Sequence, residues 1–265
     1  MQTLAIDDAT ALVSHAPAVE QLFLECFGNR MSSAIWRWAY LENPLGHPWV
    51  SVCYDGDRMV GHYAMIALPV SNGSEHVSCC LSMTTMVAAS HRQHGLFVKL
   101  ATATYDRAKA AGVAWVMGFP NEMSAPGFER RLGWRIGTPD RVVDATRAQW
   151  LEHAAELSID SALLRLDLRD ASARAWRTSR PGGDYRWNDG LLWKPYEGGI
   201  DVLSYEEPGQ LATLPPDVRI NLLLPADHPA CQHFPSRPYM FGGTDIARHF
   251  DPAPILRNMA LSDLF

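Results

Sequence analysis

The chain has 265 residues, of which 47% are hydrophobic and 20% are charged, a composition typical of a globular protein with one large domain or two small ones. Its net charge of −6 argues against general nucleic-acid binding, which usually needs a basic excess or a basic stripe. We expect a cytoplasmic protein, because no stretch approaches the ~18 apolar residues of a membrane span, the N-terminus lacks a signal-peptide pattern, and the five cysteines are scattered without a C-x-x-C pair.

The first ninety residues are predicted to form two helices followed by an antiparallel meander. Helical spacing of apolar residues covers two stretches, 17–27 and 34–42. Gly28 ends the first helix, and Ser32 or Ser33 can cap the second. Strands are expected at 49–54, 58–70 and 75–87. Asp55-Gly56 supplies the hairpin turn between the first two strands.

A short polar loop, Arg92-Gln93-His94-Gly95, joins the third strand to a helix expected over 96–111. The first N–H groups of a helix lack partners within it and carry partial positive charge, and Gly95 has no Cβ to keep a bulky group from the main chain. The loop matches neither G-x-x-x-x-G-K-[ST] nor G-x-G-x-x-G. It is therefore either a surface turn or a different kind of phosphate site.

The rest of the chain contains a weak internal repeat. A short apolar strand, a helix ending before Gly133 and a strand near 141–146 complete the first part. The sequence from Trp176 then resembles that from Trp38, and the sequence from Asp217 resembles that from Gly112. We interpret this as a duplication in which only the first copy keeps the loop, and divide the chain into domains 1–147 and 148–265.

The loop and its surroundings resemble the GNAT acetyltransferases over residues 17–145. The resemblance rests on Arg92-x-x-Gly95 after a strand ending "TMVAAS", the following helix, the strand "VAWVMGF", Asn121 and "FERRLGW". It implies an α+β fold, with a mixed, mostly antiparallel sheet flanked by helices. It also implies a second, degenerate GNAT-like half that walls the acceptor site, and acetyl-CoA or another acyl-CoA as co-substrate.

The resemblance further implies which residues bind that co-substrate. Main-chain N–H groups of the loop would hold the pyrophosphate, and main-chain groups of the preceding strand would bind the pantetheine and polarise the thioester carbonyl. The residues concerned are Thr85, Met86, Val87, Arg92, Gln93, His94, Gly95, Leu96, Phe97 and Asn121. The sequence departs from the family pattern at Phe97, where a small residue is usual. Asn121 is equally explained as a loop residue bonded to its own backbone.

The family's direct attack of an amine on the thioester requires a proton acceptor. Candidates are His62, Glu25, Glu129 and the carboxylate of the C-terminal Phe265, with Glu122 beside Asn121 as a further carboxylate. Glu129 stands where the family often has a tyrosine that acts as the acid. Each candidate also has a structural or solvated explanation. His91 and His94 lack a nearby Cys or carboxylate partner, so no metal site is expected.

These features predict an acyl-CoA-dependent N-acyltransferase that moves an acetyl or other short acyl group to a primary amine. The "W…NP.G" opening and the "GLF" loop resemble two-domain enzymes that acylate nucleotide-linked amino sugars in envelope polysaccharide pathways. An antibiotic, an amino acid or a peptide amine is the alternative acceptor, and a degenerate binding or interaction module without catalysis is the alternative function. We expect a small-molecule partner and no nucleic acid or membrane, and leave homodimer formation open.

Overall fold

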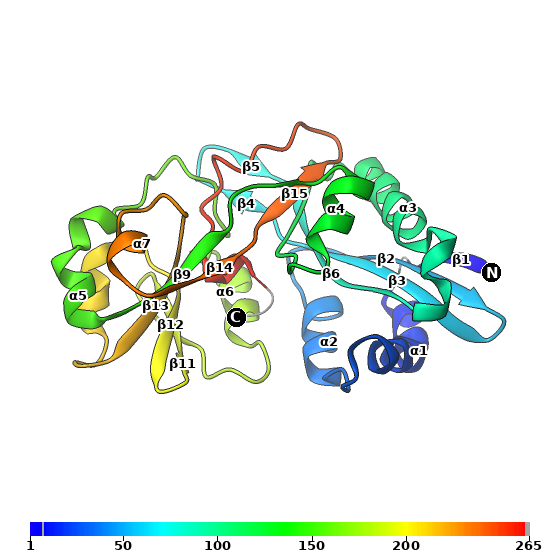
Figure 1. The fold of residues 1–265 in the computed structure, drawn as a ribbon, viewed down its shortest axis with the longest axis horizontal. Coiled ribbons are helices and arrows are strands. Elements are labelled where there is room, and N and C mark those ends of the chain that lie inside the picture. The colour runs from blue at the N-terminus through cyan, green and yellow to red at the C-terminus, as the bar shows by residue number, and fades with distance from the viewer. Residues whose placement is uncertain (7, 263–265) are drawn as a thin grey trace.

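The computed structural model describes residues 1–6 and 8–262. They form two halves side by side, each built around its own large sheet (Figure 1). The first sheet has seven strands in the order β1-β2-β3-β6-β7-β15-β8, and the second has six in the order β10-β11-β12-β13-β9-β14. The predicted α+β class with mixed, mostly antiparallel sheets is confirmed.

Helices cover both faces of the first sheet, with α1 and α2 on one side and α3 and α4 on the other (Figure 1). The elements of this half are β1 (Gln2–Ile6), α1 (Ala9–Phe27), α2 (Ser33–Tyr40), β2 (Trp49–Asp55), β3 (Arg58–Ala67), β4 (Val70–Ser71), β5 (His76–Val77), β6 (Cys79–Val87), the 3₁₀ helix η1 (Ala89–His94), α3 (Leu96–Ala110), β7 (Trp115–Gly118), α4 (Ala125–Leu132) and β8 (Arg135–Ile136).

The N-terminal segment is more ordered than the sequence suggests. Strand β1 was not predicted, and α1 begins at Ala9 rather than near Pro17, which lies inside the helix. The side chain of Asp8 accepts a hydrogen bond from the N–H of Ala11 at 2.8 Å and caps the helix. Leu12, ahead of Pro17, is buried. Capping and burial therefore outweigh the cost of an internal proline.

The second half repeats much of this arrangement. Its elements are β9 (Asp140–Thr146), α5 (Arg147–Glu152), η2 (Ala154–Leu157), α6 (Ala171–Thr178), β10 (Arg186–Asn188), β11 (Leu191–Tyr196), β12 (Gly199–Ser204), η3 (Pro208–Thr213), β13 (Arg219–Leu224), α7 (Ala230–His233), β14 (Ser236–Tyr239), β15 (Gly242–Asp245) and η4 (Met259–Leu261). Strands β12 and β13 pair in parallel, as β6 and β7 do in the first half. The repeat from Asp217 predicted this equivalence of β13 with β7.

The two halves exchange strands. Strand β9 follows β8 in the chain but pairs between β13 and β14 of the second sheet. Strand β15 follows β14 but pairs between β7 and β8 of the first sheet. The two sheets therefore do not separate at residue 147, because each contains a strand from the other side of that position.

The two tryptophans that suggested the duplication stack on each other between α2 and α6. The rings of Trp38 and Trp176 lie 4.6 Å apart at an angle of 6°. Nε1 of Trp38 donates to the carbonyl of Trp176 at 2.7 Å, and Nε1 of Trp176 donates to the carbonyl of Trp38 at 2.9 Å. Such reciprocal contacts are characteristic of two units related by an approximate two-fold axis.

The core reflects the same division. One cluster of buried hydrophobic residues runs through the first half and reaches the inner face of the second sheet, where it includes Val142, Leu203 and Leu223. A second cluster lies on the opposite face of that sheet and includes Val143 and Trp150. In the described part of the chain, no helix has the length and apolar character needed to cross a membrane.

Candidate functional site

Strands β6 and β7 diverge and leave an open fork in the first sheet. They pair at three positions, the last being Leu81 with Met117. Beyond Leu81, β6 continues to Val87 with β3 as its partner on the other side. Residues 82–85 are only half-buried, although they lie in a central strand. We use "fork" for the space between β6 residues 82–87 and the end of β7 at Gly118.

A bulge interrupts β6 inside the fork. His62 of β3 pairs with Met86 while Ala64 pairs with Met83, so that two threonines, Thr84 and Thr85, face a single residue of β3. Thr84 has a φ of +53°, in the left-handed region that a β-branched residue rarely occupies. Bulges turn neighbouring backbone groups away from regular pairing. The β6 backbone is thus displaced at the middle of the fork.

His62 supports this bulge from the buried side. Its Nδ1 lies 2.7 Å from the carbonyl oxygen of Thr84, which can only accept, so Nδ1 carries the proton. Nε2 is buried without a hydrogen-bond partner, and the side chain is 1% exposed. Burial lowers the pKa of His62 to about 4, so the ring is neutral near neutral pH. Both ring nitrogens of His62 are therefore shielded from solvent. His62 influences the fork only through its hydrogen bond to the Thr84 carbonyl.

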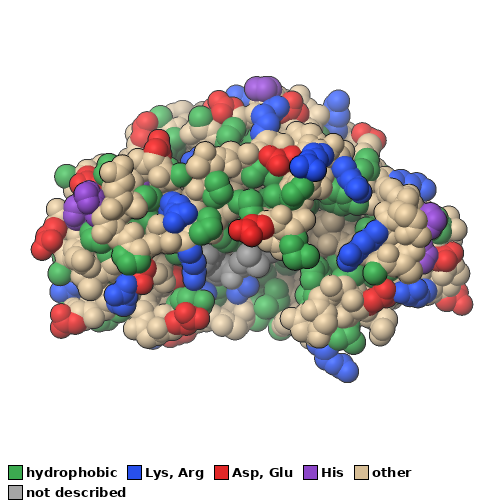
Figure 2. Space-filling model, viewed as in Figure 1, with side chains coloured by type: hydrophobic (Ala, Val, Ile, Leu, Met, Phe, Trp, Pro, Cys, Tyr) green, Lys and Arg blue, Asp and Glu red, His purple; other side chains and the backbone are tan. Residues whose placement is uncertain are grey.

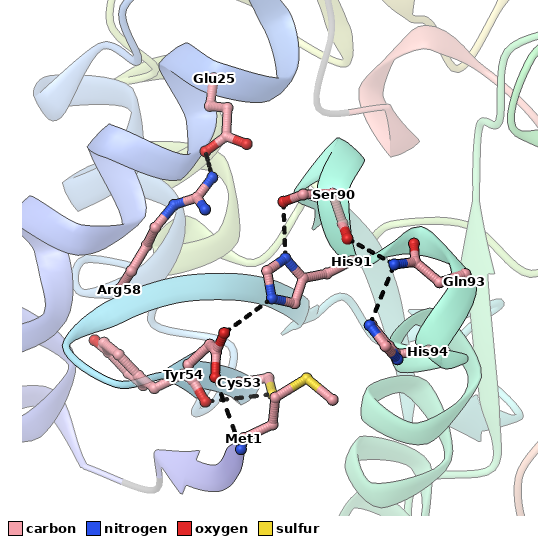
Figure 3. Close-up of polar contacts among 10 residues, drawn as sticks. Met1, Glu25, Cys53, Tyr54, Arg58, Ser90, His91, Gln93 and His94 are labelled. Carbon is pink, nitrogen blue, oxygen red and sulfur yellow. Dashed lines mark hydrogen bonds and ion pairs between the residues drawn. The ribbon is translucent and has the colours of Figure 1, made fainter.

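The loop after β6 ends at the exposed N-terminus of α3. Gly95 has a φ of +66°, no side chain caps the helix, and no heavy atom lies within 4 Å of the position that a Cβ on Gly95 would occupy. The side chain of Gln93 folds back onto the carbonyl of Ser90 at 2.8 Å and contacts His94, as Figure 3 shows. Nε of Arg92 lies 3.5 Å from the carbonyl of Val87. The loop's own side chains therefore leave the helix N-terminus accessible.

Phe97 does not block this opening. Its ring packs inward against Phe128 of α4, with centroids 5.3 Å apart, and lies 6.4 Å from the ring of Tyr63. The preceding residue, Leu96, is buried. The bulky residue at the position where the family has a small one thus takes its place in the core, and only its backbone faces the loop.

The carboxylates proposed as proton acceptors lie apart from one another. Glu25, near the end of α1, forms an ion pair with Arg58 at 2.6 Å (Figure 3). Glu129 is exposed on α4, and Glu122 is exposed in the loop before it. Phe265 lies outside the described residues. The structure therefore does not gather the candidate acids and bases into one cluster.

Asn121 forms local bonds at the start of α4. Its Oδ1 accepts from the N–H groups of Met123 at 3.1 Å and Ser124 at 2.9 Å. This corresponds to the alternative in which the side chain bonds its own loop. Of the loop histidines, His91 pairs with Asp55 at 3.3 Å. In the described parts of the chain, no group of three or more His, Cys, Asp or Glu residues is placed to hold a metal ion.

The structure adds a hydroxyl network that the sequence analysis missed. Ser82 Oγ lies 2.9 Å from the hydroxyl of Tyr63, which lies 2.7 Å from the hydroxyl of Tyr105, and Nε1 of Trp134 donates to Tyr105 at 2.9 Å. Burial raises the pKa of both tyrosines, so both phenols stay neutral. The four residues come from β6, β3, α3 and the segment after α4, so no sequence spacing connects them.

The equivalent fork in the second half is closed on one side by the C-terminal segment. Pairing of β12 with β13 stops at Asp201 and Asn221. A cavity of about 270 Å³ follows, and its wall includes residues 255–258 from the C-terminal segment. Nδ2 of Asn258 lies 3.3 Å from Oγ of Ser204, within the second fork. The chain between β12 and β13 holds only the six-residue η3, with no counterpart of α3.

A polar pocket of about 290 Å³ lies on the inner face of the second sheet. Its lining includes Asp144, Tyr196, Arg219, Asn221 and Arg237. Beside it, the buried carboxylate of Asp201 accepts from Nδ2 of Asn221 at 2.8 Å and lies 3.6 Å from Nζ of Lys194, and burial raises its pKa.

This pocket connects to the fork through aromatic contacts. Tyr239 lies two residues beyond Arg237 on β14, and its ring is 5.1 Å from that of Phe119, the residue after β7. The space-filling view shows the molecule hollowed between the two halves (Figure 2).

Comparisons with known proteins agree with this arrangement. Residues 11–137 match the acetyltransferase (GNAT) domain family. No curated protein matches the sequence. Among solved structures, the chain is similar to a GCN5-related N-acetyltransferase from Kribbella flavida, with a TM-score of 0.63, 13% identity, and coverage of 93% of this chain and 72% of that one.

Two further solved structures also match both halves. Eis1 from Mycobacterium abscessus has a TM-score of 0.54 and 14% identity, covering 91% of this chain and 73% of that one. A tandem GNAT protein from the clavulanic acid biosynthesis pathway has a TM-score of 0.51 and 12% identity, covering 94% of this chain and 100% of that one. Residues 11–137 therefore match the GNAT acetyltransferase domain, and the fold of the whole chain, its second half included, is that of tandem GNAT structures.

Proposed function

We propose that the chain transfers an acetyl group from acetyl-CoA to a primary amine. The observation that carries this proposal is the continuity of the fork with the loop. The unpaired edge of β6 runs from Ser82 to Val87, about 16 Å at the rise of a strand, and leads to the N-terminus of α3 at Gly95. An extended amide arm suits such an edge, and a pyrophosphate suits such a helix end.

The residues proposed to bind acetyl-CoA contribute either main-chain groups or side chains. The main chain of Thr85, Met86 and Val87 bonds the pantetheine arm, and the N–H groups of Gly95, Leu96 and Phe97 face the pyrophosphate. The side chains of Arg92, Gln93 and His94 surround the phosphates, and Nδ2 of Asn121 faces the arm from the β7 side. The open space over Gly95 and the inward turn of Phe97 support this fit.

The reaction depends mainly on positioning. The amine attacks the carbonyl carbon directly, the bulge at Thr84 aims backbone N–H groups of β6 at the carbonyl oxygen, and the amine's proton passes to water. His62 maintains the bulge through its bond to the Thr84 carbonyl. Glu25 is held by Arg58, and Glu129 is exposed, so neither is needed as a dedicated base in this scheme.

We further propose that the acceptor is an amino sugar on a nucleotide carrier, in envelope polysaccharide biosynthesis. The polar pocket of the second sheet supports this choice, because Arg237 lines it together with polar side chains. Arg237 and Tyr239 lie about 7 Å apart along β14, and Tyr239 contacts Phe119 at the fork. Arg237 is the cation that would meet a diphosphate at that separation, since Arg219 is ion-paired with Asp144, and Glu197 also lines the pocket.

Calorimetry with acetyl-CoA tests the donor. We expect binding, and Arg92→Ala should weaken it by about 1–2 kcal/mol, the size of one charge-assisted contact. Arg131→Ala on α4, also an exposed arginine, serves as the matched control and should bind normally. Absence of heat and of thermal shift with acetyl-CoA would contradict the proposal and favour a binding module without catalysis.

A mass-spectrometric acceptor screen tests the second substrate. It should compare nucleotide-linked amino sugars with aminoglycosides, amino acids and peptides, each with acetyl-CoA and with longer acyl-CoAs. We expect acetylated nucleotide sugar. Arg237→Ala should raise its KM while the affinity for acetyl-CoA stays the same. Turnover of any other acceptor class alone would replace the proposed one.

A further inference from the structure

The second sheet lacks one of the helices that cover the first. In the first half, α1 packs against β3 and β6 on the same face of the sheet as α2 (Figure 1). Helix α6 takes the place of α2 in the second half, where Trp176 stacks on Trp38. Residues 158–170, which precede α6, form no helix, and Trp150 of α5 packs on the opposite face. The polar pocket of about 290 Å³ therefore lies on a face that has no counterpart of α1.

The residues beside that pocket are polar where the first half is apolar. In the first half, the last parallel pair before the fork is Leu81 with Met117, both buried. In the second half, the corresponding pair is Asp201 with Asn221. Burying a charged side chain contributes no more to stability than well-packed hydrophobic residues of similar volume would. Stability alone therefore does not explain the polar pair, and a binding role does.

Asp201 holds the side chain of Asn221 in one orientation. The Asp201 carboxylate is fully buried and accepts a hydrogen bond from Nδ2 of Asn221 at 2.8 Å. Lys194 is its register partner on β11, and Nζ of Lys194 lies 3.6 Å from Oδ2 of Asp201, where it favours the ionised form. An ionised carboxylate can only accept, so the amide nitrogen of Asn221 must face it. One N–H and Oδ1 of Asn221 then remain without a partner among the described residues.

Asn221 carries these groups on the wall of the pocket, which Tyr196 also lines. The N–H and the oxygen of a primary amide together complement the donor and acceptor pairs on the edge of a nucleobase. An aromatic ring such as that of Tyr196 gives a base a surface on which to stack. Strand β13 lies two strands from β14, roughly 10 Å, so the amide and Arg237 are separated as a base and a phosphate are in a nucleotide.

We propose that this pocket is a nucleobase site, in which the amide edge of Asn221 pairs with the base of the acceptor's nucleotide carrier and Asp201 is a positioning residue that fixes the amide. This inference rests on the proposed nucleotide-linked acceptor and deepens it, because it names the residue that recognises the carrier. The phosphates extend from the base toward Arg237, and the amino sugar continues past Tyr239 to the fork.

Calorimetric titration without acetyl-CoA tests this site. The probes are the 5′-monophosphates of uridine, cytidine, adenosine and guanosine, and ribose 5-phosphate is the reference that has no base. We expect the preferred monophosphate to bind about tenfold more tightly than ribose 5-phosphate, the size of one paired base edge. This ratio of Kd values measures the contribution of the base apart from that of the phosphate.

A combined variant, Lys194→Met with Asp201→Leu and Asn221→Met, gives the second half the apolar pair of the first. It removes one positive and one negative charge, so the net charge is unchanged. We expect it to remain folded in urea denaturation, to bind ribose 5-phosphate as the wild type does, and to lose the tenfold preference for the base. With a nucleotide-linked amino sugar, its KM should rise about tenfold while kcat stays the same.

Two single variants separate positioning from structure. Asp201→Asn keeps the amide of Asn221 but offers it both a donor and an acceptor, so the amide can turn over and the preference for the base should fall without disappearing. Asn188→Met is the matched control, because Asn188 is an exposed strand asparagine on β10 that does not line the pocket. Its ratio of Kd values should equal that of the wild type.

Two results would overturn the inference. Equal affinity of the wild type for ribose 5-phosphate and for all four monophosphates shows that no base is recognised, and leaves the acetyl-CoA site intact. A preference for the base that survives in the folded combined variant removes the role of Asn221. A base preference that depends on Asn221, in a protein that acetylates no nucleotide-linked sugar in the acceptor screen, supports the nucleobase site and overturns the proposed acceptor alone.

Discussion

His62 should make the protein lose stability on acidification, and the loss can be calculated. The structure lowers its pKa to about 4, because the ring is buried and Nε2 has no partner. An unfolded histidine titrates near 6.5. Between these values the unfolded chain binds more protons than the folded one, so stability is fully present above about pH 6.5 and is lost as the pH falls toward 4.

The size of the loss follows from the two pKa values. A difference of roughly 2.5 units corresponds to about 3 kcal/mol once the pH is below both values. About 2 kcal/mol of this is already lost between pH 7 and pH 5, where the folded ring is still neutral and the unfolded ring is charged. This is a large part of the 5–15 kcal/mol typical of a domain.

The assay is urea denaturation at pH 7, 6 and 5, followed by tryptophan fluorescence. His62→Gln keeps an N–H donor for the Thr84 carbonyl and does not titrate, so its unfolding free energy should fall by about 2 kcal/mol less than that of the wild type over this range. His47→Gln, at an exposed position, is the control and should behave as the wild type does. If His62→Gln and the wild type lose the same free energy, the histidine is not held neutral and the reasoning is wrong.

Three further predictions concern the loop, the carboxylates and the contact between the halves. Gly95→Pro should abolish acetyl-CoA binding in calorimetry, because proline cannot adopt the φ of +66° found there; binding at wild-type affinity would leave the loop as an ordinary turn. Glu25→Ala and Glu129→Ala should each keep kcat/KM within about 10²-fold across the pH range, whereas a loss of about 10³-fold together with one limb of the profile would identify the base or acid. Trp38→Phe and Trp176→Phe each remove one indole donor to a buried carbonyl and should cost about 1–2 kcal/mol in urea denaturation, equally for both; a cost in one alone would contradict a reciprocal contact.

The sequence predicts those parts of the fold that depend on residues close to one another in the chain. The loop, its glycine and the helix after it depend on neighbours within a few positions, and the family resemblance adds the strands around them. Gly28, with a φ of +73°, ends α1 as expected. The start of that helix was misjudged because Pro17 is a strong local cue, while the burial of Leu12 is a tertiary effect.

The strand exchange could not be predicted, because β15 has a sequence that favours a turn. Gly242 and Gly243 open it, and glycine is depleted in strands. The structure explains both residues. A Cβ on Gly242 would lie 2.6 Å from the Ile136 side chain, and one on Gly243 would lie 2.5 Å from the carbonyl oxygen of Val116. These glycines allow β15 to fit between β8 and β7, a constraint visible only once all three strands are placed.

The candidate site also has a part that the sequence predicts and a part that depends on tertiary structure. The loop residues could be named from sequence, but the burial of His62 and its bond to Thr84 arise from a bulge set by pairing between two strands. The residues around Ser82 in the sequence give no sign that it belongs to the site. It meets Tyr63 and Tyr105 only through tertiary packing.

The position of β15 also affects how the protein is made. A ribosome completes β7 at Gly118 and must add over a hundred residues before Gly242 exists to pair with it. At roughly 5–20 residues per second, that edge of β7 waits about 6–25 s without its partner. An unpaired strand edge can form backbone hydrogen bonds with a strand of another chain and so promote aggregation. During this interval the edge of β7 is open to pairing with other chains, and the sheet beside the fork closes only after Gly242–Asp245 have been translated.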